Sequence, residues 1–214
     1  MNIQKVARLV VADLIANAMA FFKAFLKAGV MACVVACTMA STTVQASDLS
    51  DKLQSPDYVL LMRHTRAPGV GDPANYTLDD CKTQRNLSDE GRKQAVAVGH
   101  WLKKQGVQTA NVHTSAWCRC KDTAELLKLG AVTVEPALAS FFDDMAQAKT
   151  QNQQLEKFIA TQLKTKGKQA LVLVTHHVNI YEFMGENIAS GDMVLAKVDS
   201  NGKMLAYKLI ARPN

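Results

Sequence analysis

The sequence predicts an α/β fold in which a mostly parallel sheet is covered by helices on both faces. Two segments, YVLLM at 58–62 and ALVLVT at 170–175, are apolar runs of strand length, and turn residues flank the first of them. A strand that is buried on both faces has this composition, whereas a strand with one solvated face alternates. Segments with helical periodicity lie between the expected strands, which is the order typical of a parallel sheet.

The composition is that of one ordinary globular domain. The chain has 214 residues, of which 48% are hydrophobic and 21% are charged, and this mixture excludes wholesale disorder and a coiled coil. No apolar run reaches the roughly 18 to 20 residues that a membrane span needs. The net charge is +6, and half of this surplus lies in residues 1–46. Such a mixed surface indicates no nucleic-acid partner.

Residues 1–46 have the pattern of a secretory signal peptide. Basic residues precede an apolar run at 28–40, and small residues flank Gln45 in a small-x-small cleavage site. Cleavage after Ala46 predicts a periplasmic or otherwise exported protein. One alternative is a lipoprotein signal that ends before Cys37, which would give a lipid anchor. Another is an amphipathic helix that stays attached.

The expected elements follow in order after a polar lead-in at 47–57, and residues 58–214 are expected to form one domain. The strand at 58–62 leads into a loop at 65–85, which is long for a compact domain and therefore indicates a functional or mobile segment. Ser88 is placed to cap the next helix, which Gly106 ends. The later elements are a strand at 110–114, a helix at 117–129, a strand at 131–134, a helix at 150–166, the apolar strand at 170–175, a helix at 178–185 and a hairpin of strands at 193–198 and 204–210.

Both apolar strands end in a histidine. Arg63 and His64 follow the first strand, and His176 follows the second. Ligands of such sheets bind beyond the carboxyl ends of the strands, where these residues would meet. Arg119 lies near the start of the helix that follows the strand at 110–114. Guanidinium groups and a helix N-terminus bind phosphate, and a neutral imidazole can attack phosphorus, so the pattern predicts a phosphate site.

Four segments resemble, in the same order, motifs of the histidine phosphatase superfamily, whose fold is phosphoglycerate mutase-like. They are LMRHT (61–65), NLSDEGRKQA (86–95), TSAWCRCKDTA (114–124) and LVTHHVNI (173–180). The resemblance, more closely to exported bacterial members, implies a three-layer α/β/α sandwich and a phosphomonoester hydrolase that forms a covalent phosphohistidine. It implies that His64 is the nucleophile and that Arg63, Arg119 and His176 bind the phosphoryl group. It implies no metal and no cofactor, and a small phosphorylated molecule as the substrate.

The sequence departs from the family pattern at the proton donor. The family's commonest donor is a Glu in an L-x-E segment, where this chain has Ser140. Asp143 or Asp144 is the candidate donor to the leaving oxygen, and Glu135 is a weaker one. If no acid reaches the site, activated esters and phosphoramidates are the favoured substrates.

Further departures concern the residues beside the histidines. Thr65 and His177 stand where the family usually has glycine. Neighbours on a strand point to opposite faces, so His176 and His177 are not expected to share one role. Arg66, two residues after the nucleophile, is expected to contact the substrate in preference to Arg85.

Three cysteines remain after the predicted signal peptide. An oxidising compartment favours pairing, and Cys118 and Cys120 are too close in the chain to pair readily with each other. The sequence therefore predicts a disulfide between Cys81 and one of these two, which would hold the 65–85 loop beside Arg119. A zinc site lacks a CxxC pair and a fourth ligand at a usual spacing.

Two other functions compete with a phosphatase. The first is a phosphate-binding or sensing module with weak catalysis on the same fold, which Ser140 at the usual Glu position suggests. The second is a metallohydrolase that uses His64, His113, His176 and His177, although no HxH, HExxH or Asp-rich pattern supports it.

Overall fold

The structure is a computed structural model that describes residues 48–213. The signal peptide predicted for residues 1–46 and the alternative lipid site at Cys37 lie outside the described residues. Within residues 48–213, no helix combines the length and apolar character that crossing a membrane requires.

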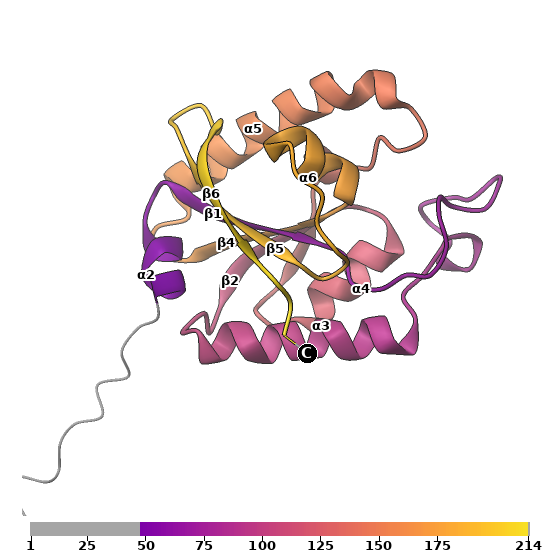
Figure 1. Cartoon of the computed structure of the whole chain (residues 1–214), viewed down its shortest axis with the longest axis horizontal. Coiled ribbons are helices and arrows are strands. Elements are labelled where there is room, and N and C mark those ends of the chain that lie inside the picture. Colours follow the sequence, from indigo (N-terminus) through magenta and orange to yellow (C-terminus); the bar gives the residue numbers. More distant parts are fainter. Residues whose placement is uncertain (1–47, 214) are drawn as a thin grey trace, which may run out of the picture. The chain divides into compact units, whose positions relative to one another are not determined.

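A six-stranded sheet forms the centre of the domain, in the order β3-β2-β4-β1-β5-β6 (Figure 1). The strands are β1 (Tyr58–Arg63), β2 (Ala110–Thr114), β3 (Val132–Val134), β4 (Ala170–Thr175), β5 (Met193–Val198) and β6 (Met204–Ile210). The pairs β1–β4, β2–β4 and β2–β3 are parallel, and the hairpin β5–β6 is added antiparallel to β1. The prediction of a mostly parallel sheet is therefore confirmed.

Helices cover both faces of the sheet and complete the predicted three layers (Figure 1). They are α2 (Asp48–Gln54), α3 (Asp89–Lys104), α4 (Cys118–Leu126), α5 (Ala148–Thr165) and α6 (His177–Met184), with short 3-10 turns η1 (Cys81–Thr83), η2 (Pro136–Leu138) and η3 (Met145–Gln147). Leu60 and Met62 of β1 pack with α2, α3 and α4, whereas Val59 and Leu61 pack with α5 and α6. All four side chains are fully buried, which explains the continuous apolar run.

The segment predicted as a polar lead-in contains a helix. In α2, Leu49 and Leu53 lie four residues apart on one face and join the buried core, while Asp48 and Lys52 form an ion pair on the outside. The segment has only two apolar residues, which is too few to show helical periodicity in the sequence. The folded part of the chain therefore includes α2, ahead of the expected start at residue 58.

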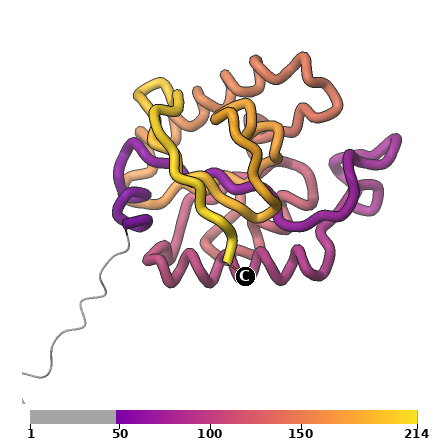
Figure 2. Tube along the Cα trace, viewed as in Figure 1, coloured from indigo at the N-terminus to yellow at the C-terminus, as the bar shows by residue number. Residues whose placement is uncertain are grey.

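The long loop and α3 are held together by close backbone contact. We call residues 65–87, between β1 and the N-cap of α3, the cavity loop; its path beyond the end of β1 is clear in Figure 2. Ser88 caps α3 as predicted, because its side chain accepts a hydrogen bond from the backbone N–H of Gly91. A Cβ atom at Gly91 would lie 2.1 Å from the carbonyl oxygen of Arg66, so only glycine allows α3 to pack this closely.

Candidate active site

The two histidine-bearing strands end side by side at one edge of the sheet. Residue His64 follows β1 and residue His176 follows β4. Parallel pairing sets Arg63 opposite Thr175, and the backbone N–H of His64 donates to the Thr175 carbonyl oxygen over 3.0 Å. The two imidazole rings lie 5.7 Å apart, measured between centroids. The histidines singled out from the sequence are therefore neighbours in the fold.

His64 presents one free ring nitrogen. Its Nδ1 lies 2.8 Å from the Thr65 carbonyl oxygen, and because a carbonyl only accepts, Nδ1 carries the proton. The other nitrogen, Nε2, then keeps its lone pair. The side chain is 2% exposed, and this burial, together with the guanidinium groups of Arg119 and Arg63, lowers the pKa of His64 to about 3. At neutral pH His64 is a neutral imidazole suited to nucleophilic attack.

His176 is held in a defined orientation by two partners. Its Nδ1 lies 3.4 Å from Nη2 of Arg119, and a guanidinium only donates, so Nδ1 accepts. Its Nε2 then donates to Oγ of Ser115, 2.8 Å away. Complete burial is the main reason that the pKa of His176 lies well below its ordinary value, with the Arg119 charge as the second cause. His176 is therefore a neutral, fixed group beside His64.

A buried aspartate engages Arg119 at the cavity. Nη1 of Arg119 donates to both carboxylate oxygens of Asp72, at 2.9 and 3.0 Å, and the two side chains are only 4% and 3% exposed. Asp72 also accepts from the backbone N–H of Arg85 at 2.9 Å and from the Trp117 indole N–H at 3.1 Å. Every partner donates, which is the pattern of an ionised carboxylate. Asp72 therefore orients Arg119 and cancels one positive charge.

The other guanidinium groups are tied to backbone carbonyls. Arg63 donates through Nη1 to Ile188 over 2.7 Å, and Arg85 donates through Nε to Gly71, also over 2.7 Å. Within the described residues, the Nε atoms of Arg63 and Arg119 are buried without a hydrogen-bond partner. An unpaired buried donor is costly, and an oxygen-rich anion supplies the kind of acceptor that these groups lack.

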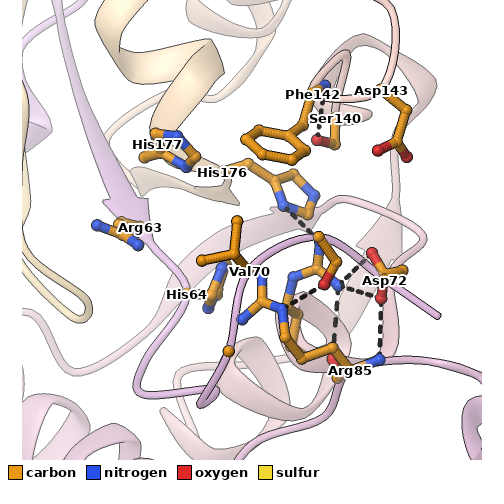
Figure 3. Close-up of a pocket in the computed structure, with 13 residues that line it drawn as sticks. Arg63, His64, Val70, Asp72, Arg85, Ser140, Phe142, Asp143, His176 and His177 are labelled. Carbon is orange, nitrogen blue, oxygen red and sulfur yellow. Dashed lines mark hydrogen bonds and ion pairs between the residues drawn. The ribbon is translucent and has the colours of Figure 1, made fainter.

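These groups line a cavity of about 330 Å³, drawn in Figure 3. Its lining is Arg63, His64, Gly69, Val70, Gly71, Asp72, Arg85, Arg119, Ser140, Phe142, Asp143, His176 and His177. Figure 3 shows Phe142, Ser140 and Asp143 across the cavity from His64 and Arg85, with Val70 between the two sides. The cavity therefore has a cationic side, which carries His64, and an opposite side with no basic residue except His177.

The structure separates the candidate proton donors. Asp143 lines the cavity, and its Oδ2 accepts from the Tyr76 hydroxyl at 3.2 Å. Asp144 is absent from the lining and instead caps η3 by accepting from the N–H of Ala146. Glu135 similarly caps η2. Of the three carboxylates that the sequence offered, Asp143 alone reaches the cavity.

The two loop arginines are placed opposite to the expected preference. Arg66, expected to contact substrate, is absent from the cavity lining, and its Nε pairs with Glu90 at 3.2 Å on the surface. The Arg66 carbonyl oxygen accepts from the N–H of Ser88 at the start of α3. Arg85, at the other end of the cavity loop, lines the cavity instead.

A disulfide joins the cavity loop to the start of α4. It links Cys81 and Cys118, 37 residues apart, which confirms one of the two predicted pairings. Gln84 strengthens the junction, because its side-chain oxygen accepts from the Cys118 backbone N–H at 2.9 Å. Cys120 stays a free thiol, 3.5 Å from Nε2 of His176, and burial raises its pKa to about 12. The disulfide thus holds the loop next to Arg119, as expected.

The metallohydrolase alternative gains no geometric support. His113 does not line the cavity and instead packs edge-on against Phe158, with ring centroids 5.0 Å apart. Among residues 48–213, no group of three or more His, Cys, Asp or Glu side chains is arranged to hold a metal ion.

Sequence reasoning missed Asp72, Ser115 and Phe142. The cavity loop also contains Asp79 and Asp80, and no local pattern distinguishes Asp72 from them. Ser115 belongs to the segment 114–124 that resembles the family, and it lies in the turn between β2 and α4. Its place at the end of a strand was the signal that could have identified it.

Comparison with known proteins agrees with the fold. A family model described as the histidine phosphatase superfamily (branch 1) matches residues 59–168. A comparison with curated proteins finds no match.

Solved structures with the same fold include three phosphatases. The protein histidine phosphatase SixA complexed with tungstate is 19% identical, with 72% of this chain and 95% of that chain covered and a TM-score of 0.50. A mycobacterial glucosyl-3-phosphoglycerate phosphatase is 16% identical, with 74% and 99% covered and a TM-score of 0.51. A putative alpha-ribazole-5'-P phosphatase from Escherichia coli is 17% identical, with 73% and 96% covered and a TM-score of 0.51. Since the family model spans more than half of the residues, the chain belongs to the histidine phosphatase superfamily.

Proposed function

We propose that this protein is an exported phosphomonoester hydrolase that works through a phosphohistidine on His64. The observation that carries the proposal is the neutral His64, whose Nε2 is free and whose ring lies beside three guanidinium groups. A phosphate monoester carries close to two negative charges. The guanidinium groups supply positive charge for the phosphoryl oxygens, so neither a metal ion nor a cofactor is required.

The first step transfers the phosphoryl group to the enzyme. The lone pair of Nε2 attacks phosphorus, and the bond from phosphorus to the leaving oxygen breaks. The Nδ1–H bond to the Thr65 carbonyl stabilises the positive charge that develops on the ring. Arg63 and Arg119 bind the phosphoryl oxygens, on which charge builds up in the transition state. His176, whose Nδ1 accepts from Arg119 and whose Nε2 donates to Ser115, orients Arg119 for this role. In the second step water attacks phosphorus, the P–N bond breaks and inorganic phosphate is released.

The leaving oxygen needs a proton, and Asp143 is the candidate donor because it lines the cavity. In the second step the resulting carboxylate would take a proton from the attacking water. Asp72 is unsuited to this role, since each of its partners donates to it.

Export is part of the proposal. The Cys81–Cys118 disulfide supports it, because such bonds persist in oxidising compartments and are rare in the cytosol. The signal-peptide pattern in residues 1–46 supports it independently.

A phosphate-binding module with weak catalysis is the second candidate. Ser140 favours it, because this residue lines the cavity without a carboxyl group and its Oγ is engaged by the N–H of Phe142 at 3.2 Å. The cavity of this module would bind phosphate without turning over esters.

The decisive experiment uses protein purified in the oxidised state after export. Hydrolysis of p-nitrophenyl phosphate is measured in EDTA, because this ester has a good leaving group and makes little demand on a proton donor. We expect His64→Ala to lose at least about 1,000-fold in kcat/KM, and Arg66→Ala, which removes only a surface ion pair, to stay within about twofold. Equal turnover in wild type and His64→Ala would refute His64 as the nucleophile. Vanadate binding without turnover in the wild type would instead identify the binding module.

A further inference from the structure

The cationic side of the cavity matches the charge of one phosphoryl group. Arg63, Arg85 and Arg119 line it, and the carboxylate of Asp72 cancels one of their charges. The histidines add none at neutral pH, because burial lowers the pKa of His64 and His176. What remains is about two positive charges, which is what one phosphate monoester neutralises.

Each of the three guanidinium groups is anchored by hydrogen bonds to a fixed acceptor. Arg63 is bonded to Ile188, Arg85 to Gly71, and Arg119 to Asp72, at 2.7 to 3.0 Å. These bonds hold the charged ends on the side of the cavity that carries His64. A guanidinium that swung toward the leaving group would have to break them.

The opposite side of the cavity offers no cation to a second anion. Val70 is 87% exposed and Phe142 is 39% exposed, so both present apolar surface. Asp143 accepts from the Tyr76 hydroxyl and forms no ion pair with another described residue. His177 lies against the Phe142 ring, with centroids 5.8 Å apart, and burial lowers its pKa.

We propose that this cavity selects phosphomonoesters of small, uncharged leaving groups and rejects substrates that carry a second anion, whether a carboxylate or a second phosphate. The inference rests on the proposed function and names its substrate class. A cavity of about 330 Å³ lies at the small end of the range for ligand sites, which limits the leaving group to a small alcohol. The inference is independent of proton donation, because Asp143 attracts no anion in either protonation state.

The test compares two substrates of nearly equal size. Glycerol 3-phosphate ends in a neutral CH2OH group where 3-phosphoglycerate has a carboxylate. We expect kcat/KM to favour glycerol 3-phosphate about tenfold in the wild-type protein at low salt. The Val70→Lys variant places a cation beside the leaving group and should reduce this preference about threefold to fivefold, the size of an exposed ion pair. Val70→Gln is the matched neutral control and should keep the preference.

The dependence of kcat/KM on salt distinguishes an effect of charge at position 70 from an effect of side-chain shape. Ionic strength screens exposed charges, so 0.5 M salt should remove most of the difference between Val70→Lys and Val70→Gln. Equal kcat/KM for the two wild-type substrates, or a preference for 3-phosphoglycerate, would overturn the inference. A change of the same size in Val70→Gln would also overturn it.

A separate measurement keeps the two proposals distinguishable. Binding of both phosphates to the His64→Ala protein is measured by calorimetry and should show the same order of affinity without any turnover. If the wild type hydrolyses no ester and this order is kept, the proposed hydrolase fails and the charge selection stands. If esters are hydrolysed and the order is absent, the charge selection fails alone.

Discussion

Two regions build the same cavity by different physical means. The strand-end region consists of Arg63, His64 and His176, which lie where β1 and β4 leave the sheet. Its backbone is held by the parallel ladder, and the β1 residues behind it are fully buried. The cavity loop supplies Asp72 and Arg85 from a segment that contains no strand or α-helix. It is held by side-chain hydrogen bonds and one disulfide.

The difference indicates that the strand-end region holds the reacting groups in place, whereas the cavity loop can vary the contacts to substrate. A ladder between buried strands tolerates little movement, so the strand-end region can keep His64, the proposed nucleophile, oriented. A loop held by a few side chains can change sequence without unfolding the sheet, so it is the place to vary charge and substrate contact. Changes in the strand-end region should therefore abolish activity, whereas changes in the cavity loop should reduce it.

After His64, the largest effect is expected at His176, and its neighbour gives the matched control. His176→Asn removes the imidazole that accepts from Arg119 and should lower kcat/KM for p-nitrophenyl phosphate about 1,000-fold, because the guanidinium that stabilises the transition state is then misplaced. His177→Asn changes only a half-buried ring against Phe142 and should cost less than about tenfold. Thermal unfolding of both variants is measured beside the kinetics. If both variants are folded and lose kcat/KM to a similar extent, His176 has no special role in catalysis.

A smaller effect is expected at Asp72. Asp72→Asn keeps the shape but removes the charge that holds Arg119, and it should lower kcat/KM about 10-fold to 100-fold. Asp79→Asn, an exposed aspartate of the same loop, should be neutral. Arg119→Lys alone should also be costly, because a lysine cannot replace a planar fork.

The two variants together test the assignment of Asp72. If Asp72 acts through Arg119, the double variant should lose much less than the product of the two single losses. Independent losses would show that Asp72 acts elsewhere, for example through Trp117.

The sequence predicted the strand-end region better than the cavity loop, for a physical reason. Buried strands require continuous apolar runs, and such runs end where the backbone leaves the core, so the apolar pattern alone places His64 and His176 at one edge of the sheet. The backbone of Arg66 packs closely against Gly91, and Arg85 bonds to the carbonyl oxygen of Gly71, and no periodicity in the sequence records either contact. Asp72 pairs with Arg119, which lies 47 positions further along the chain, so no local pattern links them. The helix α2 was missed because its segment offers only two leucines to the core.

The smallest effect on activity is expected from the disulfide, although its effect on stability is larger. The double variant Cys81→Ala, Cys118→Ala opens a closed loop of 37 residues, and chain entropy then lowers the free energy of unfolding by about 2 to 4 kcal/mol. Vanadate affinity should fall only about threefold to tenfold, because the strand-end region is untouched and Gln84 and Asp72 still hold the loop. Dithiothreitol should reproduce both effects in the wild type and change nothing further in the double variant. If vanadate affinity instead fell about 1,000-fold, the size of the kcat/KM loss expected for His176→Asn, the cavity loop would be as essential as the strand ends, and the division between the two regions would not hold.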